Sequence, residues 1–194
     1  MKFFLIRHGE TTGDVEDRYG GDYDDLLTLK GKRQSKELAT KLRVKDIELI
    51  FHSPKSRAMQ TAKILSGELH AQMKSVLDIR ERNYYAQLSG MTKSEAQEKY
   101  PELVAELKRE KIRPNIPDAE DYDSFKKRVL HAIDHIAENT DSTVAIVCHG
   151  GPISCFLREV IGKESKKIED CAFLEVQYRE GIYSLKTVDG VEFE

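Results

Sequence analysis

Residues 143–148 read Thr-Val-Ala-Ile-Val-Cys, and residues 149–152, which follow directly, read His-Gly-Gly-Pro. An unbroken apolar run of this length, rich in β-branched residues, is typical of a strand that is buried on both faces of a sheet. The glycines and the proline that follow predict a tight turn into a helix over 152–161. A strand covered on both sides indicates an α/β protein, and the rest of the chain can be interpreted outward from it.

Strands and helices are predicted in alternation on either side of this stretch. We expect strands at 2–7, 47–52, 172–178 and 182–188, and helices at 28–43, from 54 to about 69, at 92–99, 102–110 and 122–138. Thr28 and Ser53-Pro54 are the expected starts of the first two helices, and residues 78–91 look irregular. The alternation predicts a three-layer α/β/α sandwich with a mostly parallel central sheet, formed by a single domain over residues 1–194.

Polar clusters follow three of the predicted strands. They are Arg7-His8-Gly9, the segment from Ser53 to Arg57, and His149-Gly150-Gly151. Ligands of open α/β sheets bind beyond the carboxyl ends of the strands, so these clusters converge if the strands are parallel neighbours.

The residue types in these clusters suit an anion such as phosphate. Arginine offers a planar fork of donors, and glycine turns let backbone N–H groups approach a ligand. A neutral histidine in such a site is a competent nucleophile toward phosphorus. Each residue also has an ordinary interpretation, because a lone histidine at a strand end is usually structural and a lone arginine such as Arg57 is usually solvated. The convergence of three strand ends favours the functional interpretation.

Composition narrows the class of partner. The net charge is −3 and no basic stripe is visible, so we expect a small molecule rather than a nucleic acid. The three cysteines, Cys148, Cys155 and Cys171, lack paired spacings, which favours a reducing compartment, and we expect a cytoplasmic protein. Residues 3–6 form an apolar run that is too short for a signal peptide, and no segment is long enough to span a membrane. The sequence does not decide between a monomer and a dimer.

Four blocks of the sequence resemble the histidine phosphatase superfamily, in its phosphoglycerate mutase-like branch. The first block is Arg7-His8-Gly9-Glu10-Thr11, and the second matches Ser-x-x-x-Arg-Ala-x-Gln-Thr-Ala over residues 53–62. The third is Glu81-Arg82-Asn83-Tyr84, and the fourth is Val147-Cys148-His149-Gly150-Gly151. One triplet would be weak support, but four blocks in the family's order and spacing are strong support. The resemblance implies the family's fold and a phosphohistidine mechanism.

The resemblance also implies roles for individual residues. His8 would be the phosphorylated nucleophile, Arg7, Arg57 and His149 would hold the phosphoryl group, and Glu81 would be the general acid and then the base. Further contacts to the substrate would come from Gly9, Thr11, Asp14, Gly21, Arg82, Tyr84, Lys93 and Gly150. A short helical cap would be inserted at about 82–120. No metal and no cofactor is implied, because cationic side chains meet the charge of the phosphate.

Two features, one at Asp14 and one at the pair His131 and His135, call for separate interpretation. Asp14 stands where the family often has asparagine, and its carboxylate would repel a phosphate unless it is protonated, turned away, paired with Arg18 or in contact with a particular substrate group. His131 and His135 lie four residues apart on a predicted helix, a spacing that can bind zinc. No glutamate follows the first histidine and no third ligand is evident, so we favour an ordinary helix face.

Three functions remain open. A phosphatase would transfer the phosphoryl group from His8 to water, whereas a phosphoglycerate mutase would return it to a hydroxyl of a sugar acid. The segment 92–120 is short for the capping insertion of a mutase, so we expect a phosphatase acting on a small phosphorylated metabolite. A non-catalytic phosphate-binding module is the third possibility, and the presence of both His8 and Glu81 disfavours it.

Overall fold

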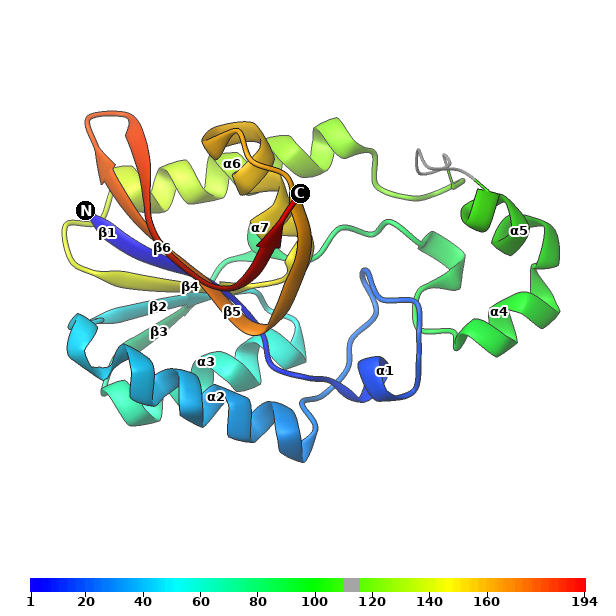
Figure 1. The fold of residues 1–194 in the computed structure, drawn as a ribbon, viewed down its shortest axis with the longest axis horizontal. Coiled ribbons are helices and arrows are strands. Elements are labelled where there is room, and N and C mark those ends of the chain that lie inside the picture. The colour runs from blue at the N-terminus through cyan, green and yellow to red at the C-terminus, as the bar shows by residue number, and fades with distance from the viewer. Residues whose placement is uncertain (110–115) are drawn as a thin grey trace.

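A six-stranded sheet forms the centre of the computed structural model, which describes residues 1–109 and 116–194. The strand order is β3-β2-β4-β1-β5-β6 (Figure 1). The strands are β1 (Lys2–Arg7), β2 (Leu49–His52), β3 (Gln72–Ser75), β4 (Val144–Cys148), β5 (Ser165–Arg179) and β6 (Ile182–Phe193). The first four of these strands pair in parallel, and β5 and β6 are antiparallel additions next to β1. The expectation of a mostly parallel sheet is therefore confirmed.

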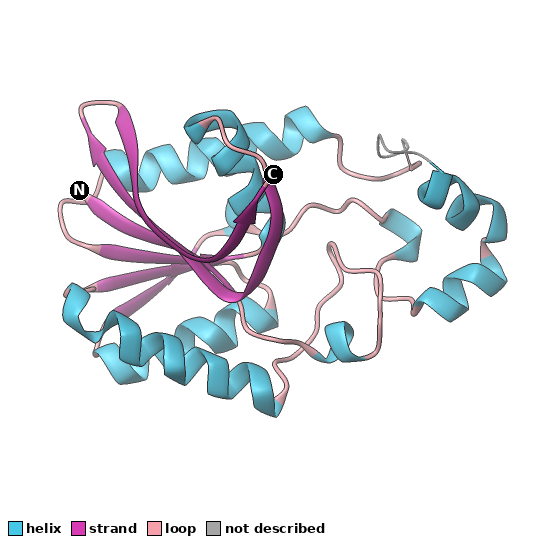
Figure 2. Cartoon of the chain, in the orientation of Figure 1, coloured by secondary structure: helices cyan, strands magenta, loops and turns pink. Residues whose placement is uncertain are grey.

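Helices cover both faces of the sheet (Figure 2). Helices α2 (Leu29–Leu42) and α3 (Ser56–Leu69) lie on one face, and α6 (Tyr122–Glu138) and α7 (Gly150–Phe156) lie on the other. Alternate residues of β1 supply the two cores: Phe3 and Leu5 belong to the cluster with α6 and α7, whereas Phe4 and Ile6 belong to the cluster with α2 and α3. Side chains of a strand point to opposite faces in turn, so this short apolar strand joins two hydrophobic layers. The three-layer sandwich is confirmed.

The remaining helices lie beyond the carboxyl ends of the parallel strands (Figure 1). They are α1 (Thr12–Val15), α4 (Lys93–Lys99) and α5 (Pro101–Arg109). A small hydrophobic cluster of their own, formed by Tyr19, Leu88, Ala96 and Val104, stabilises this region apart from the two main cores. Two backbone hydrogen bonds join Tyr19 to this region: its N–H donates to the carbonyl of Met91 at 2.9 Å, and its carbonyl accepts from the N–H of Gly90 at 2.8 Å.

Short helical turns connect the larger elements. They are 3₁₀ turns at η1 (Arg43–Lys45), η2 (Leu77–Ile79) and η3 (Ala86–Leu88), and a π-helical turn at η4 (Leu157–Ile161). Residues 78–91 are otherwise irregular, as expected.

Several element boundaries differ from the sequence prediction. Strand β3 and helix α1 were not predicted: β3 is an exposed edge strand of polar sequence, and α1 is a single turn closed by a capping box. Strands β5 and β6 extend beyond 172–178 and 182–188 because their polar ends pair with each other across register shifts. Thr28 caps α2 as expected, but α3 begins at Ser56 after Lys55 rather than at Ser53-Pro54. The last residue of the helix predicted at 102–110, and residues 110–115 of the cap expected at 82–120, lie outside the described residues.

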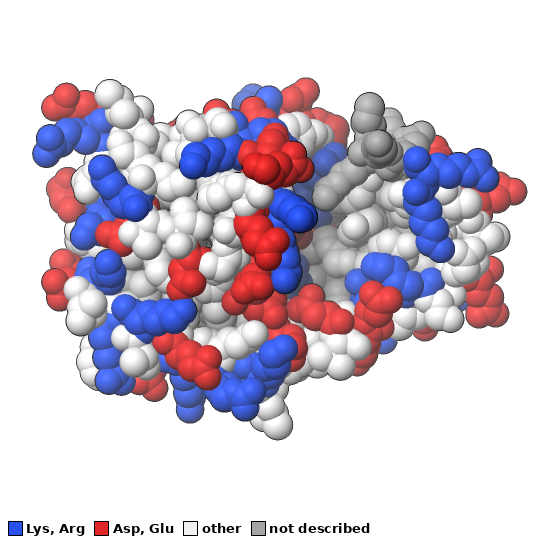
Figure 3. Space-filling view, in the orientation of Figure 1, with Lys and Arg blue, Asp and Glu red and all other residues white. Residues whose placement is uncertain are grey.

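Charged side chains of both signs are interspersed on the face shown in Figure 3. That pattern is typical of a solvated surface. Among the described residues, the longest apolar helices fall short of what a bilayer crossing requires.

Candidate active site

The three polar clusters meet because β2, β4 and β1 are adjacent and parallel. The backbone N–H of His8 donates to the carbonyl of Cys148 at 3.2 Å, and that of Ser53 donates to the carbonyl of Val147 at 2.9 Å. The last residues of β1 and β4, Arg7 and Cys148, stand opposite each other in the ladder. The predicted convergence at one sheet edge is confirmed.

His8 is buried, and its two hydrogen bonds define its tautomer. Its Nδ1 lies 2.9 Å from the carbonyl oxygen of Gly9, which can only accept, so Nδ1 carries the proton. Its Nε2 lies 3.1 Å from Nε of Arg57, which can only donate, so Nε2 carries the lone pair. The imidazole therefore presents Nε2 as a nucleophilic atom.

His149 lies beside His8, with ring centroids 5.1 Å apart, and has no exposed surface. Arg57 Nε also donates to its Nδ1 at 3.2 Å, so His149 carries its proton on Nε2 and donates to Ser53 Oγ at 2.8 Å. One N–H of Arg57 is thus shared between two imidazoles. Burial, followed by the charge of Arg57, lowers the pKa of both histidines well below the usual value of 6.5. Both rings are neutral at neutral pH.

The guanidinium of Arg57 is fixed by the loop before α2. Its Nη1 donates to the carbonyl of Tyr23 at 2.7 Å and to Asp25 Oδ1 at 2.8 Å, and both members of this ion pair are buried. Its Nη2 donates to the carbonyl of Gly21 at 3.2 Å. Gly21 has a φ of +88°, a conformation that favours glycine, so the turn that delivers this carbonyl depends on the residue type.

Arg7 is held between two carboxylates. Its Nη1 donates to the carbonyl of Ile168 at 2.5 Å, and its Nη2 lies 3.3 Å from Asp170 Oδ1 and 3.9 Å from Asp14 Oδ1. Burial raises the pKa of Asp170, the Asp14 carboxylate adds to this rise, and Arg7 opposes it. Asp14 does not pair with Arg18. Its other oxygen accepts from the backbone N–H and hydroxyl of Thr11, both at 2.8 Å, and closes the capping box of α1.

Glu81 reaches the same site from the irregular segment after β3. Its Oε2 accepts from the N–H of Gly151 at 3.0 Å, and its Oε1 accepts from the N–H of Arg82 at 2.8 Å. A Cβ at position 151 would lie 2.0 Å from Glu81 Oε1. Gly151 is therefore the residue that lets the carboxylate approach the start of α7.

Arg128 on α6 fixes the backbone that carries Glu81. It donates to the carbonyls of Asp78, Arg80 and Glu81 at 2.7, 2.9 and 3.1 Å. It also forms a fork with the Glu120 carboxylate at 2.6 and 2.7 Å. Glu120 also contacts the residue after Glu81, because its backbone carbonyl accepts from Arg82 Nε at 2.8 Å. The Arg128–Glu120 pair thus holds the chain on both sides of Glu81.

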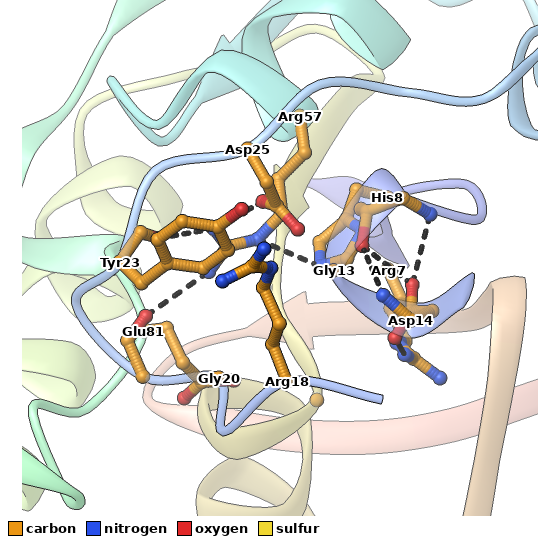
Figure 4. Close-up of a pocket in the computed structure, with 13 residues that line it drawn as sticks. Arg7, His8, Gly13, Asp14, Arg18, Gly20, Tyr23, Asp25, Arg57 and Glu81 are labelled. Carbon is orange, nitrogen blue, oxygen red and sulfur yellow. Dashed lines mark hydrogen bonds and ion pairs between the residues drawn. The ribbon is translucent and has the colours of Figure 1, made fainter. Parts of the chain in front are cut away.

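Two cavities meet at Glu81. The smaller, of about 170 Å³, is called the His8 pocket here, and Figure 4 shows Arg7 and Asp14 on one side of it and Glu81 on the other. The larger, of about 680 Å³, is called the tyrosine pocket after Tyr84, Tyr85 and Tyr122, which line it with Phe125 and two arginines. Both are lined by Gly20, Gly21, Glu81 and Gly150.

The residues expected from the sequence are distributed over both cavities. The His8 pocket is lined by Arg7, His8, Thr11, Asp14, Gly21, Arg57, Glu81 and Gly150, and the tyrosine pocket adds Arg82 and Tyr84. Neither lining includes Gly9, Lys93 or the fully buried His149. Gly9 packs against Gly31, and Lys93 lies 3.9 Å from the ring centroid of Tyr19.

Among the described residues, no cysteine lines the His8 pocket, and Cys155 lines the tyrosine pocket. Burial raises the pKa of the Cys148 thiol and raises that of Cys171 to about 12, so both are unreactive thiols at neutral pH. Within residues 1–109 and 116–194, no three side chains of His, Cys, Asp or Glu come together as a metal site requires.

Comparison with known proteins agrees with this geometry. The family model of the histidine phosphatase superfamily, branch 1, matches residues 3–188. The chain belongs to the histidine phosphatase superfamily. It is similar to the uncharacterized phosphatase PhoE of Bacillus subtilis, with 27% identity over 94% of this chain and 91% of PhoE. It is also similar to the probable phosphoglycerate mutase GpmB of Yersinia enterocolitica, with 26% identity over 93% of this chain and 86% of GpmB.

The fold of this histidine phosphatase superfamily member matches solved structures as well. Bacillus stearothermophilus YhfR superposes with a TM-score of 0.85, covering 97% of this chain and 96% of that chain at 22% identity. The likeness shows that the two chains share the same arrangement of sheet and helices.

Sequence reasoning missed several residues that shape this site. Gly151 lies inside one of the blocks that carry the resemblance and Asp25 lies outside all four, and the sequence gives no sign of the contacts that either residue makes. Arg128 and Asp170 lie far along the chain from the residues they bind. Glu120 pairs with Arg128 on the helix that follows it. The sequence alone does not show which arginine Glu120 would bind, so this role of Arg128 could not be predicted.

Proposed function

We propose that the protein is a phosphatase that hydrolyses a small phosphomonoester through a phosphohistidine on His8. The observation that carries the proposal is the tautomer of His8: the proton is on Nδ1, and Nε2 faces Arg57 with its lone pair. A buried neutral imidazole next to guanidinium groups suits in-line attack on a phosphate dianion.

In the first step, Nε2 of His8 attacks phosphorus while the bond from phosphorus to the ester oxygen breaks. Arg7 and Arg57 meet the charge on the transferring phosphoryl oxygens, and His149 supports Arg57 through their shared N–H. Glu81, in its protonated form, gives its proton to the leaving oxygen, so that a neutral alcohol departs.

In the second step, a water molecule attacks phosphorus and the phosphorus–nitrogen bond breaks. Glu81, now a carboxylate, takes one proton from that water, and inorganic phosphate leaves as neutral His8 is restored. The cycle returns every group to its starting form, so the residues present are sufficient without a cofactor.

A phosphatase is favoured over a mutase by the cavity beyond Glu81. A mutase must retain its three-carbon intermediate and exclude water, whereas a volume of about 680 Å³ next to Glu81 gives water and bulky alcohols access. The similarity to proteins named phosphatase and probable phosphoglycerate mutase fits either reaction. The presence of both His8 and Glu81 disfavours a non-catalytic phosphate-binding module.

The proposal extends to the wider context of the enzyme. Its partner would be a small phosphorylated metabolite in the cytoplasm. The described part of residues 82–120, which is 82–109 and 116–120, would form a small cap over the site within a single domain, because α4 and α5 lie beyond the carboxyl ends of the strands (Figure 1).

Transient labelling tests the mechanism. Brief incubation with a labelled phosphomonoester and an alkaline quench should leave acid-labile label on the wild-type protein and none on His8→Ala. Label that persists on His8→Ala would refute the assignment of the nucleophile.

A further inference from the structure

The contact between the two cavities determines where the alcohol part of a substrate lies. Glu81 lines both the His8 pocket and the tyrosine pocket. A phosphoryl group next to His8 must place its leaving oxygen within reach of Glu81, because a general acid acts at hydrogen-bond distance. The rest of the alcohol then continues into the tyrosine pocket. This step rests on the proposed function.

The tyrosine pocket is built from rings and a guanidinium. The guanidinium of Arg82 lies 5.1 Å from the ring centroid of Tyr84 and 5.6 Å from that of Tyr122. Tyr84 packs edge-on against Tyr85 with centroids 4.8 Å apart, and Phe125 lies 6.2 Å from Tyr122. Ring faces and a guanidinium plane stack favourably on other planar π-systems.

The polar groups of this pocket orient its rings. The Tyr122 hydroxyl donates to Glu159 at 2.8 Å and accepts from Arg158 Nη1 at 3.1 Å. Arg158 is itself neutralised by a fork with Glu164 at 2.6 and 2.9 Å. Tyr122 is therefore held by its hydroxyl end, and Arg158 offers a charge that is already balanced. Ser154 and Ser165 also line the pocket, but their hydroxyls hydrogen-bond each other at 2.7 Å, so the flat ring and guanidinium surfaces are the main groups left to contact a ligand beyond Glu81.

The size of the pocket agrees with its chemistry. A volume of about 680 Å³ lies in the range of sites that hold drug-sized ligands. A three-carbon acid or glycerol would leave most of that space to water and would give the rings nothing to contact.

We propose that the tyrosine pocket is a subsite for an aromatic or heteroaromatic ring, and that the substrate is a phosphomonoester whose alcohol carries such a ring close to the ester oxygen. The ring stacks among Tyr84, Arg82 and Tyr122. Small aliphatic phosphates enter the same active site without this contribution to binding.

Binding of three phosphonates tests the subsite without any turnover, since their carbon–phosphorus bond is not cleaved. They are propylphosphonate, 3-cyclohexylpropylphosphonate and 3-phenylpropylphosphonate, and isothermal titration calorimetry gives their dissociation constants. We expect the phenyl compound to bind about tenfold more tightly than the propyl compound, with the cyclohexyl compound between them. A phenyl-to-propyl ratio below about threefold, including no measurable binding of either, overturns the proposal. Equal affinities of the phenyl and cyclohexyl compounds overturn it too, because they would indicate a merely apolar cavity.

Variants of Tyr122 test whether the preference for the phenyl compound arises in the tyrosine pocket. Tyr122→Leu should bring the phenyl-to-propyl ratio close to one, whereas Tyr122→Phe, which keeps the ring, should retain most of the preference. A preference that survives Tyr122→Leu in a protein with an unchanged melting curve overturns the assignment to this pocket. Release of phosphate from propyl phosphate is measured separately, and its absence would refute the proposed hydrolysis while the phosphonate ratio still reports on the subsite.

Discussion

At the scale of single residues, the site depends on which nitrogen of each histidine carries the proton. Gly9 and Arg57 leave the lone pair of His8 on Nε2, and Ser53 and Arg57 give His149 the opposite tautomer. Neither histidine needs to gain or lose a proton before attack on phosphorus. In the proposed cycle, Glu81 therefore acts as both the acid and the base.

Replacing Glu81 with glutamine keeps the shape of the side chain and removes its proton transfer. Glu81→Gln should slow turnover of alkyl phosphates by roughly 10²–10⁴-fold, the usual contribution of a general acid. An aryl phosphate with a good leaving group needs little protonation, so its single-turnover phosphorylation of His8 should be much less affected. Equal losses on both classes of substrate would show that Glu81 is only structural.

Asp14 lies 3.9 Å from Arg7 Nη2, so its carboxylate would compete with a phosphate bound by Arg7. Asp14→Asn retains an acceptor for the capping box of α1 and removes the charge 3.9 Å from Arg7 Nη2. We expect KM for small phosphomonoesters to fall by about two- to fivefold near pH 7, the scale of a partly exposed ion pair. Asp141→Asn, which removes an exposed carboxylate after α6, serves as the control. An unchanged or higher KM in Asp14→Asn alone would show that the Asp14 charge is already compensated.

The sequence predicts the residues at the strand ends but not their supports. His8, Arg57 and His149 are predictable because three apolar strands deliver them to one edge of the sheet. Asp25, Gly151 and Asp170 are not, because their roles depend on contacts between loops whose paths no periodicity describes. Lys93 shows the converse, since the resemblance implied a substrate contact for it but it lies in neither cavity lining.

At the scale of elements, α6 connects the hydrophobic core to the segment that carries Glu81. One face of the helix buries Phe125 and Val129 under the sheet, while Arg128 between them holds three carbonyls and Glu120. Arg128 on α6 thereby fixes the backbone of the irregular segment that carries Glu81.

Loss of Arg128 should misplace Glu81 without touching the nucleophile. We expect Arg128→Gln to lower kcat on alkyl phosphates by about 10- to 100-fold, because displacing a catalytic group by about 1 Å has effects of this size. Arg128→Lys should recover part of the loss. Phosphorylation of His8 by an aryl phosphate should change little, a distinction that general destabilisation would not produce. The exposed neighbour Lys127→Gln is the matched control, and equal losses on aryl and alkyl esters would contradict the positioning role.

Strands with a strong apolar pattern are predictable from the sequence. Strands that form only because a neighbouring strand pairs with them are not. Strands β1, β2 and β4 carry buried apolar runs. The strand β3 forms because β2 offers it an edge, and its polar sequence bears no mark of that pairing. The outer halves of β5 and β6 likewise stabilise each other.

At the scale of the whole molecule, two buried neutral histidines link stability to pH. The pKa of both His8 and His149 is lowered by folding, so between that lowered value and about 6.5 the unfolded chain binds more protons than the folded one. The free energy of unfolding must then rise with pH through this window and fall as the solution is acidified below pH 6.5.

Urea unfolding at a series of pH values measures this linkage. Below about pH 6.5, each of the two histidines should remove up to about 1.4 kcal/mol of stability per pH unit. His8→Gln should reduce that slope, whereas His131→Gln, on the exposed face of α6, should leave it unchanged. A slope in His8→Gln equal to that of the wild type would contradict the linkage.

The alternation of β1 has a genetic consequence. Phe3 and Leu5 face one core and Phe4 and Ile6 face the other, while the same strand ends on Arg7 and His8. Insertion or deletion of one codon within residues 3–6 would exchange the two faces of the strand or shift the nucleophile out of line with Cys148. Substitutions among apolar residues can be tolerated here, but a change in length cannot be tolerated without losing either the core or the chemistry. The length of this strand is therefore constrained both by the packing of the sheet and by the placement of His8.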